Sequence, residues 1–386
     1  MILKQNKEIK QIWHNGKRIE TIMKNHKLIF GKKIRHLTPY YMIIDQSEGK
    51  FEITNSEYCD DFFKWFMDGI KMCWCKKFPD GIMRACRMKQ MMRPGVEYDV
   101  MCEGDKSIAF NGYYMRGTEQ NKKDLGPNYI HRGDYMINYP EVFYLGVNAG
   151  NDKWIVYFDK KPFPGCVSNL GPEVLLAQTC CRDINNMAYA SPDGVSTYNY
   201  ASASSKIEAR GEGYSMLSWD QRCLLTFLYM MNNKTNDVSS GPWGSNIFGM
   251  DSFVADRSEL QGNCYNENKI LTVTHDDGVV ETFDCTFFPT TIVKQPIRKL
   301  FIGKYLMIIP SEIGNPGTTG GGVFLYNNGP NYASYPESGD FNILSGTFDK
   351  GGIGATCTTR LAYMGPIIWM ETDEEVIEFD DFEVIN

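Results

Sequence analysis

The sequence of 386 residues predicts an α+β fold in which strands dominate. The first indication is composition, because 22 Tyr and 22 Phe favour strands and 36 Gly favour many turns. The second is one strong helix signal at residues 218–232, and the third is a repeat of short strand-like units at the N-terminus. We expect an N-terminal β-repeat segment (1–37), a β-rich middle domain (38–162) and a C-terminal domain (163–386) around one buried helix, with an acidic tail.

The N-terminal segment contains an internal repeat in which a polar turn headed by Asn precedes a short strand. Asn6, Asn15 and Asn25 head the three units, at intervals of nine or ten residues. Asn15 and Gly16 form a strong two-residue hairpin signal. Three strands of this length bury too little apolar surface to stand alone. The segment is therefore expected to dock onto its own chain, a sister chain or a larger assembly; the alternative is that it forms the first sheet of the following domain.

The middle region combines one short helix with several strands. Residues 57–70 predict an amphipathic helix whose apolar residues include Phe62, Phe63, Trp65 and Phe66. Residues 117–131 are polar and predict a loop. The predicted strands cover residues 98–102, 135–139, 141–144 and 153–158. A tripeptide known from cell adhesion, Arg132 to Asp134, also occurs here, but a three-residue match is common by chance.

The best helix signal of the C-terminal half begins at Ser218, which is a good N-cap. Gln221 stands at capping-box spacing, and Asp220 places a negative charge where the helix dipole favours it. From Cys223 to Met231 only Thr226 interrupts the apolar residues. A helix that is apolar on nearly every face is normally buried. We expect the rest of the domain to surround this helix.

Loops and strands are predicted on both sides of that helix. The segment from Phe163 to Lys206 predicts loops, and residues 311–339 form a long segment rich in Gly and Asn. A loop of that length is usually functional or disordered, and its aromatic residues argue against disorder. The predicted strands cover residues 270–274 and 279–283 as a hairpin, 300–309 as a buried strand, and 359–363 and 366–370 near the end.

Charge and cysteine content exclude several functional classes. The net charge is −7, and acidic residues crowd into residues 371–383, which argues against nucleic acid as a partner. No apolar run approaches a membrane span of about 20 residues, and the lysine-rich N-terminus lacks the apolar core of a signal peptide. The 12 Cys lack regular spacing, so reduced thiols in a cytoplasm are favoured over a zinc site at Cys73, Cys75 and Cys86.

The order of these pieces resembles the C-type-lectin-like domain of bacteriophage tail, fibre and tropism-determinant proteins. A Gly-Tyr element at 213–214, the capped helix, the Gly-Pro-Trp-Gly turn at 241–244, a hairpin, a Gly-rich loop and residues 360–363 carry the resemblance. It covers residues 165–370. Separately, the N-terminal Asn-Gly-Lys repeats resemble the attachment segments of virion proteins from phages of gut Bacteroidetes. The resemblance implies a virion component that displays a surface able to bind a host receptor or glycan.

The chain departs from two groups that share this fold. Calcium-dependent lectins carry Glu-Pro-Asn or Gln-Pro-Asp with Trp-Asn-Asp. The nearest match here is Gln-Pro-Ile at residues 295–297, in which Ile297 replaces the Asn or Asp that supplies the acceptor oxygen. A calcium sugar site is therefore not expected. Formylglycine-generating enzymes use a C-terminal cysteine pair, whereas here Cys357 has Cys285 as its nearest cysteine in sequence. That enzyme class remains a third and less favoured interpretation.

The residues themselves predict no catalytic site, no metal site and no cofactor. There are five His, and His275 falls in the predicted hairpin turn. The adjacent acids Asp276 and Asp277 follow it, and a solvated turn explains these two acids better than catalysis. Cys223 lies in the buried helix, where burial raises a thiol pKa and does not activate it. Gly320–Gly322 lacks the Lys and Ser/Thr of a phosphate loop.

The best candidates for receptor contact are Tyr and Asn in the long Gly-rich segment. Tyr supplies large contact area at a low entropic cost and Asn supplies adaptable hydrogen bonds, although such tyrosines often only pack on their own domain. The candidate residues are Tyr326, Asn327, Asn328, Asn331, Tyr332 and Tyr335.

These observations predict a virion structural protein, made in the cytoplasm of a host bacterium. Its N-terminal segment would mount it on other virion proteins as a homo-oligomer, expected to be a trimer. The C-terminal domain would bind a host receptor or glycan, without inserting into a membrane. The alternative is a purely architectural virion protein, such as a collar, a hub or a capsid decoration.

Overall fold

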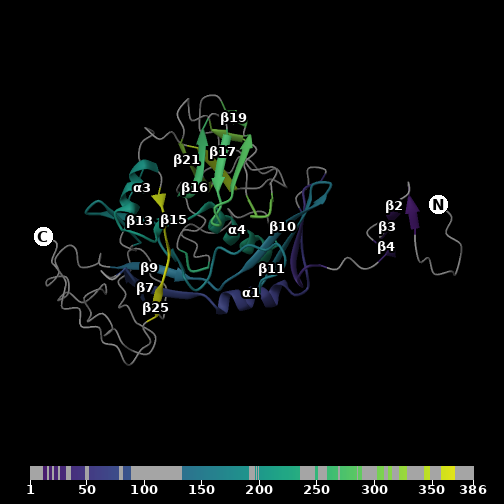
Figure 1. Ribbon diagram of the computed structural model, residues 1–386, viewed down its shortest axis with the longest axis horizontal. Coiled ribbons are helices and arrows are strands. Elements are labelled where there is room, and N and C mark those ends of the chain that lie inside the picture. The colour runs from purple at the N-terminus through teal and green to yellow at the C-terminus, as the bar shows by residue number, and fades with distance from the viewer. Residues whose placement is uncertain are drawn as a thin grey trace.

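The chain folds into several β-sheets with three helices among the described residues, which is a β-rich α+β fold (Figure 1). The computed structural model describes residues 12–14, 17–19, 21–24, 27–31, 36–47, 52–77, 81–87, 133–190, 196, 198, 200–234, 248–250, 259–267, 270–284, 286–288, 302–307, 312–314, 321–327, 343–347 and 358–369. The predicted strand at 98–102 and the predicted loop at 117–131 lie outside this part of the chain.

The N-terminal repeat forms two short hairpins. Strand β1 (Ile12–His14) pairs with β2 (Lys17–Ile19), and β3 (Thr21–Lys24) pairs with β4 (Lys27–Gly31). The register opposes His14 and Lys17, so Asn15 and Gly16 connect the first hairpin as predicted. Among the described strands these four pair only with one another.

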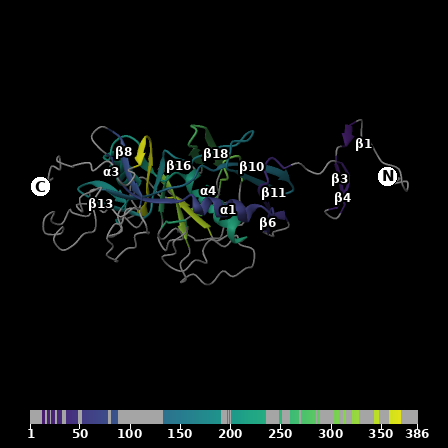
Figure 2. The same ribbon diagram turned by 90° about the horizontal axis from the view of Figure 1, so that it is seen from below.

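A four-stranded antiparallel sheet and one helix follow. The sheet has the order β10 (Phe143–Gly150), β11 (Lys153–Asp159), β5 (Tyr40–Asp45) and β6 (Glu52–Asn55). Helix α1 (Cys59–Asp68) confirms the predicted helix: Phe62 and Phe66 are buried, whereas Phe63 and Trp65 are partly buried. Helices α1 and α4 (Trp219–Asn233) contact each other, and they lie side by side in Figure 2.

A seven-stranded sheet draws strands from both sides of the boundary predicted between residues 162 and 163. Its outer strands come from late in the chain, and β9 pairs with β12 across that boundary. The two predicted regions therefore share one sheet. Its order is β15 (Tyr214–Met216), β24 (Leu361–Met364), β12 (Val174–Ala177), β9 (Asp134–Asn138), β7 (Lys71–Lys77), β8 (Met83–Arg87) and β25 (Ile367–Trp369).

This sheet must curve strongly, because β24 and β25 stand far apart in it but only Gly365 and Pro366 separate them. Five strand spacings of about 4.8 Å would separate them by about 24 Å in a flat sheet. Three residue steps reach at most about 11 Å. Pro366 accepts a hydrogen bond from the Met83 N–H, and the Gly365 N–H donates to Glu173. The two ends of the sheet are thereby brought together around a second buried apolar cluster.

The segment predicted as loops from Phe163 to Lys206 contains regular structure, so that prediction is wrong there. Besides β12 it holds the hairpin of β13 (Cys181–Ile184) and β14 (Met187–Ala190) and helix α3 (Tyr200–Glu208). Asn185 and Asn186 form the hairpin turn with φ of 51° and 62°, a conformation that Asn tolerates. The two asparagines are the sequence signal that could have predicted this hairpin.

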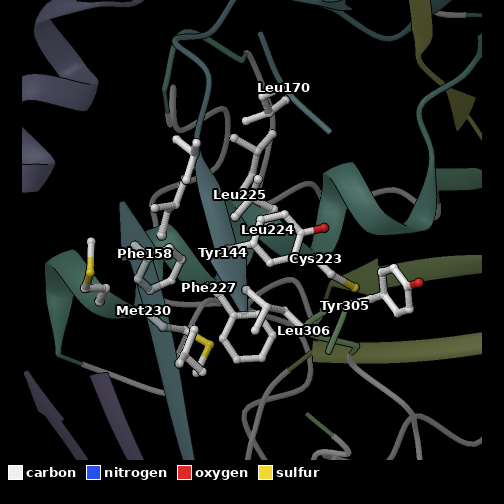
Figure 3. Close-up of a cluster of buried hydrophobic side chains, with 14 of the residues drawn as sticks. Tyr144, Phe158, Leu170, Cys223, Leu224, Leu225, Phe227, Met230, Tyr305 and Leu306 are labelled. Atoms are coloured by element: carbon white, nitrogen blue, oxygen red, sulfur yellow. The ribbon is translucent and has the colours of Figure 1, made fainter. Parts of the chain in front are cut away.

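Helix α4 confirms the predicted buried helix and lies at the centre of the main apolar core. Its residues from Trp219 to Leu228 are all buried, and it ends at Lys234 in the left-handed conformation. Figure 3 shows Leu224, Leu225 and Phe227 of the helix packed with side chains of β10, β11 and the turn at 302–307. The core thus joins segments that are far apart in sequence.

A third sheet stands on the other side of α4 (Figure 1). The predicted hairpin is confirmed as β17 (Ile270–Thr274) and β18 (Val280–Asp284). The sheet has the order β18, β17, β16 (Glu259–Glu267), β21 (Gly321–Asn327) and β22 (Ile343–Thr347); β23 (Thr358–Thr359) pairs with β16, and β19 (Thr286–Phe288) pairs separately with β20 (Glu312–Gly314).

Two sequence predictions in this region need correction. Residues 302–307 form a buried turn and not the predicted strand, because their apolar side chains pack into the core around α4. Residues 321–327, within the predicted Gly- and Asn-rich loop, form β21, whose backbone pairs with β16 and β22. Glycine weakens a strand, so the composition concealed it.

Candidate functional site at the start of helix α4

The start of helix α4 is held by a complete capping box. The Ser218 hydroxyl accepts a hydrogen bond from the Gln221 N–H at 3.1 Å, and the Gln221 side chain accepts one from the Ser218 N–H at 3.1 Å. This arrangement satisfies two N–H groups that a helix leaves without intrahelical partners. Asp220 follows in the first turn and is only 2% exposed. A buried carboxylate therefore lies at the positive end of the helix dipole.

The turn between β17 and β18 packs directly against this carboxylate. His275 is 1% exposed and lies between two acids: its Nδ1 is 2.8 Å from Oδ1 of Asp220, and its Nε2 is 3.2 Å from Oε2 of Glu281. Burial alone favours the neutral ring. The hydrogen bonds and charges of Asp220 and Glu281 outweigh burial and raise the pKa of His275 above its ordinary value.

Asp276 is the second titratable group that contacts the capping box. Its Oδ2 accepts a hydrogen bond from the Ser218 hydroxyl at 3.0 Å, and its Oδ1 accepts one from the Asn263 amide at 3.0 Å. Its own N–H donates to Oδ2 of Asp220 at 3.0 Å. Burial, and after it the charge of Asp220, raise the pKa of Asp276 to about 7. Its carboxyl therefore changes charge near neutral pH.

The turn at 302–307 closes the cluster from another side. The ring of Tyr305 stacks on the ring of His275 with a centroid distance of 3.6 Å. The Tyr305 hydroxyl donates to Oδ2 of Asp277 at 2.8 Å, and Lys304 Nζ is 3.8 Å from the same oxygen. Partial burial opposes ionisation of Asp277, but the bond from Tyr305 and the charge of Lys304 lower its pKa. We call the set Ser218, Asp220, His275, Asp276, Glu281 and Tyr305 the α4 junction.

The α4 junction can hold and release protons, but its geometry offers no nucleophile. The Ser218 hydroxyl is 3% exposed and already bonded within the cap and to Asp276. Within the part of the chain that the structure describes, no three His, Cys, Asp or Glu side chains are arranged to hold a metal ion. The solvated turn predicted for Asp276 and Asp277 is correct for Asp277, which is exposed, but Asp276 is partly buried.

The predicted receptor-contact residues are only partly described. Tyr326 and Asn327 lie at the end of β21, where the backbone pairs with Leu344 and Ile343 of β22. Asn328, Asn331, Tyr332 and Tyr335 lie outside the described residues. Their role in contact remains a prediction.

Asp134 of the cell-adhesion tripeptide has a structural position. It is 0% exposed, and its two carboxylate oxygens accept hydrogen bonds from Arg210 at 3.1 Å and 2.6 Å. Tyr214 and the Ala190 N–H also donate to it. A carboxylate enclosed in this way is not available to a receptor, so the tripeptide does not serve adhesion through Asp134.

The described cysteines are free thiols. Cys73 and Cys75 are buried on β7, and their side chains lie beside carbonyl groups of β9. Burial raises the pKa of Cys75 well above its ordinary value. Cys86 has no described side chain, and Cys285 and Cys357 lie outside the described residues.

Sequence reasoning identified the cap and the hairpin but not the contact between them. Asp220 and His275 are 55 residues apart, and no local periodicity indicates that their side chains meet. The available signal was chemical: a histidine directly after an apolar strand and an acid in the first turn of a buried helix each need a buried partner.

Comparison of the chain with protein families, curated proteins and solved structures finds no match. Among the described helices, none has the length and apolar character needed to cross a bilayer.

Proposed function

We propose that this chain is a virion structural protein of a bacteriophage that displays a lectin-like domain for adhesion to a host receptor or glycan. The observation that supports it most is that separate pieces of the resemblance lie together. Strand β15, with the Gly-Tyr element, pairs with β24, which carries residues 361–363. Between them, the Leu217 N–H donates to Arg360 at 2.9 Å, one residue before the cap of α4.

The adhesive surface would lie at the sheet that contains β21. Tyr326 and Asn327 end this strand, and the remaining candidate residues follow directly in the sequence. The aromatic rings would supply contact area and the amides would supply hydrogen bonds. A homotrimer would repeat a weak site three times, so that avidity compensates for modest affinity at each site.

The N-terminal segment would mount the protein on other virion proteins. Each of its two hairpins is a separate two-stranded sheet among the described strands, and isolated two-stranded hairpins are marginally stable in water. A partner that covers them would supply the missing burial. The architectural alternative shares this mounting role and differs in predicting no contact with the host.

The test measures binding of the purified full chain to host cells and to surface glycans extracted from them. We expect Tyr332→Ala combined with Tyr335→Ala to weaken binding about tenfold or more, since aromatic anchors carry most interface energy. The control is Tyr58→Ala, at an exposed tyrosine beside α1. Unchanged binding removes this site from the proposal. A chain that co-purifies with particles but binds no host cell supports the architectural role.

A further inference from the structure

The α4 junction joins the β17–β18 hairpin of the third sheet to the start of α4. The third sheet contacts the helix through the Gly262 N–H, which donates to Leu217 at 2.8 Å, and through the hydrogen bonds of the β17–β18 turn. At this turn the His275 ring contacts Asp220, Glu281 and Tyr305. Asp277 accepts a hydrogen bond from Tyr305, and the carboxyl of Asp276 accepts hydrogen bonds from Ser218 and Asn263. The sheet is thus attached through titratable groups in addition to the apolar packing of Cys264, Val273 and Phe283 against the core around α4.

We propose that the α4 junction is a proton-dependent latch, which holds the β17–β18 hairpin on α4 while protonated and releases the hairpin when its protons are lost. In the protonated state His275 donates from both ring nitrogens, one to Asp220 and one to Glu281. A neutral imidazole has one N–H and one lone pair. Deprotonation would therefore turn one of these two hydrogen bonds into a repulsive contact.

Asp276 acts in the same direction. In its neutral form it lies beside Asp220 without a second negative charge. When it ionises, two negative charges lie at the start of α4, and the charge of Asp220 opposes the ionisation of Asp276. The loss of either proton thus weakens the same attachment. The charged and titratable groups around His275 and Asp276 come from three other parts of the fold and from the hairpin itself. They are Asp220 of α4, Asp277 and Glu281 of the hairpin, Lys304 and Tyr305 of the 302–307 turn, and Tyr144 of β10.

These groups do not all favour release. The charge of Lys304 and the hydroxyl of Tyr305 hold Asp277 ionised in an exposed position, so Asp277 contributes little to a change near neutral pH. The pKa of Tyr144 is raised well above its ordinary value by burial, so its hydroxyl stays neutral throughout this range. Asp276 and His275 are therefore the groups whose charge changes as the hairpin is released.

Release would alter the sheet that carries the predicted contact strand. Strand β17 pairs with β16, and β16 pairs with β21, whose end holds Tyr326 and Asn327. Only this consequence for adhesion rests on the proposed function. The latch itself is a property of the fold and is measured without a receptor.

The test is hydrogen exchange of the full chain at about pH 5.5 and about pH 8.5, the range over which histidine-based switches act, with rates corrected for intrinsic exchange. We expect the amides of β17 and β18 to lose protection by about tenfold or more at the higher pH, since each pKa unit of linkage corresponds to a factor of ten. The amides of β5 and β11, which lie in another sheet, should keep their protection from exchange at the higher pH.

Two neighbouring substitutions separate the latch from a general effect of pH. Asp276→Asn removes the carboxyl that ionises and should retain more protection at the higher pH than the unmodified chain. Asp277→Asn changes the adjacent exposed acid and should leave the pH dependence unchanged. His275→Gln, if it folds, should lack the extra protection at low pH. Equal protection of β17 and β18 at both pH values, or the same pH dependence in Asp276→Asn as in the unmodified chain, would overturn the proposal.

Discussion

The buried pair of Asp134 and Arg210 allows the sharpest test of how this fold is stabilised. The side chain of Arg210 is 8% exposed and that of Asp134 is 0% exposed. The Arg210 guanidinium also lies 3.8 Å from the ring centre of Tyr189 and 4.4 Å from that of Tyr214. The pair connects β9 with the segment that follows α3, so its loss should loosen the seven-stranded sheet.

The change Asp134→Asn keeps the shape of the side chain and removes its charge. Breaking a buried ion pair by neutralising one partner typically costs about 3–5 kcal/mol, because the other charge stays buried without compensation. Arg210 would keep its hydrogen bonds to the Ala188 carbonyl and the Tyr214 hydroxyl. We therefore expect the lower end, a loss of about 3 kcal/mol in the free energy of unfolding.

The matched control is Asp45→Asn, which breaks the pair with Lys153. These side chains are 24% and 34% exposed, and pairs in contact with water contribute about 0–1 kcal/mol. Urea denaturation followed by tryptophan fluorescence measures both losses, since Trp219 is fully buried. The double variant Asp134→Asn with Arg210→Met should be more stable than Asp134→Asn alone, because it removes the uncompensated cation. Equal and small losses for Asp134→Asn and Asp45→Asn would refute the reasoning.

Two further substitutions test local features of the core. Ser218→Ala removes the cap of α4 and its bond to Asp276, and should lower the free energy of unfolding by about 1–2 kcal/mol in urea denaturation; no loss would mean that water replaces the cap. Gly146→Ala would place a Cβ 2.2 Å from the Gly303 carbonyl oxygen, so β10 and the 302–307 turn must separate. We expect a loss of about 1–3 kcal/mol, visible as a lower Tm. Gly81→Asn has nothing within 4 Å of the added Cβ, and Asn is the residue that best tolerates the φ of +83° there, so it should lower the Tm less; equal Tm values for the two variants would contradict this explanation.

The sequence by itself determined those elements whose signals are local. The capping box at Ser218 and Gln221, the apolar run of α4 and the two strand segments of the β17–β18 hairpin with the turn between them each depend on residues a few positions apart, so all three were predicted and confirmed. The first hairpin of the N-terminal repeat followed from Asn15 and Gly16 in the same way. The lectin-like resemblance and the receptor-contact residues stay predictions.

Only the tertiary structure decided which elements meet. A Gly-rich segment became strand β21 because β16 and β22 pair with its backbone on both sides, which no side-chain pattern encodes. An apolar segment predicted as a strand became the buried turn at 302–307 because the core around α4 offered burial without a strand partner. His275 acquired its partner Asp220 from a helix 55 residues earlier in the chain. Local propensity limits what each segment can form, but burial and hydrogen bonding between distant segments select the structure that it adopts.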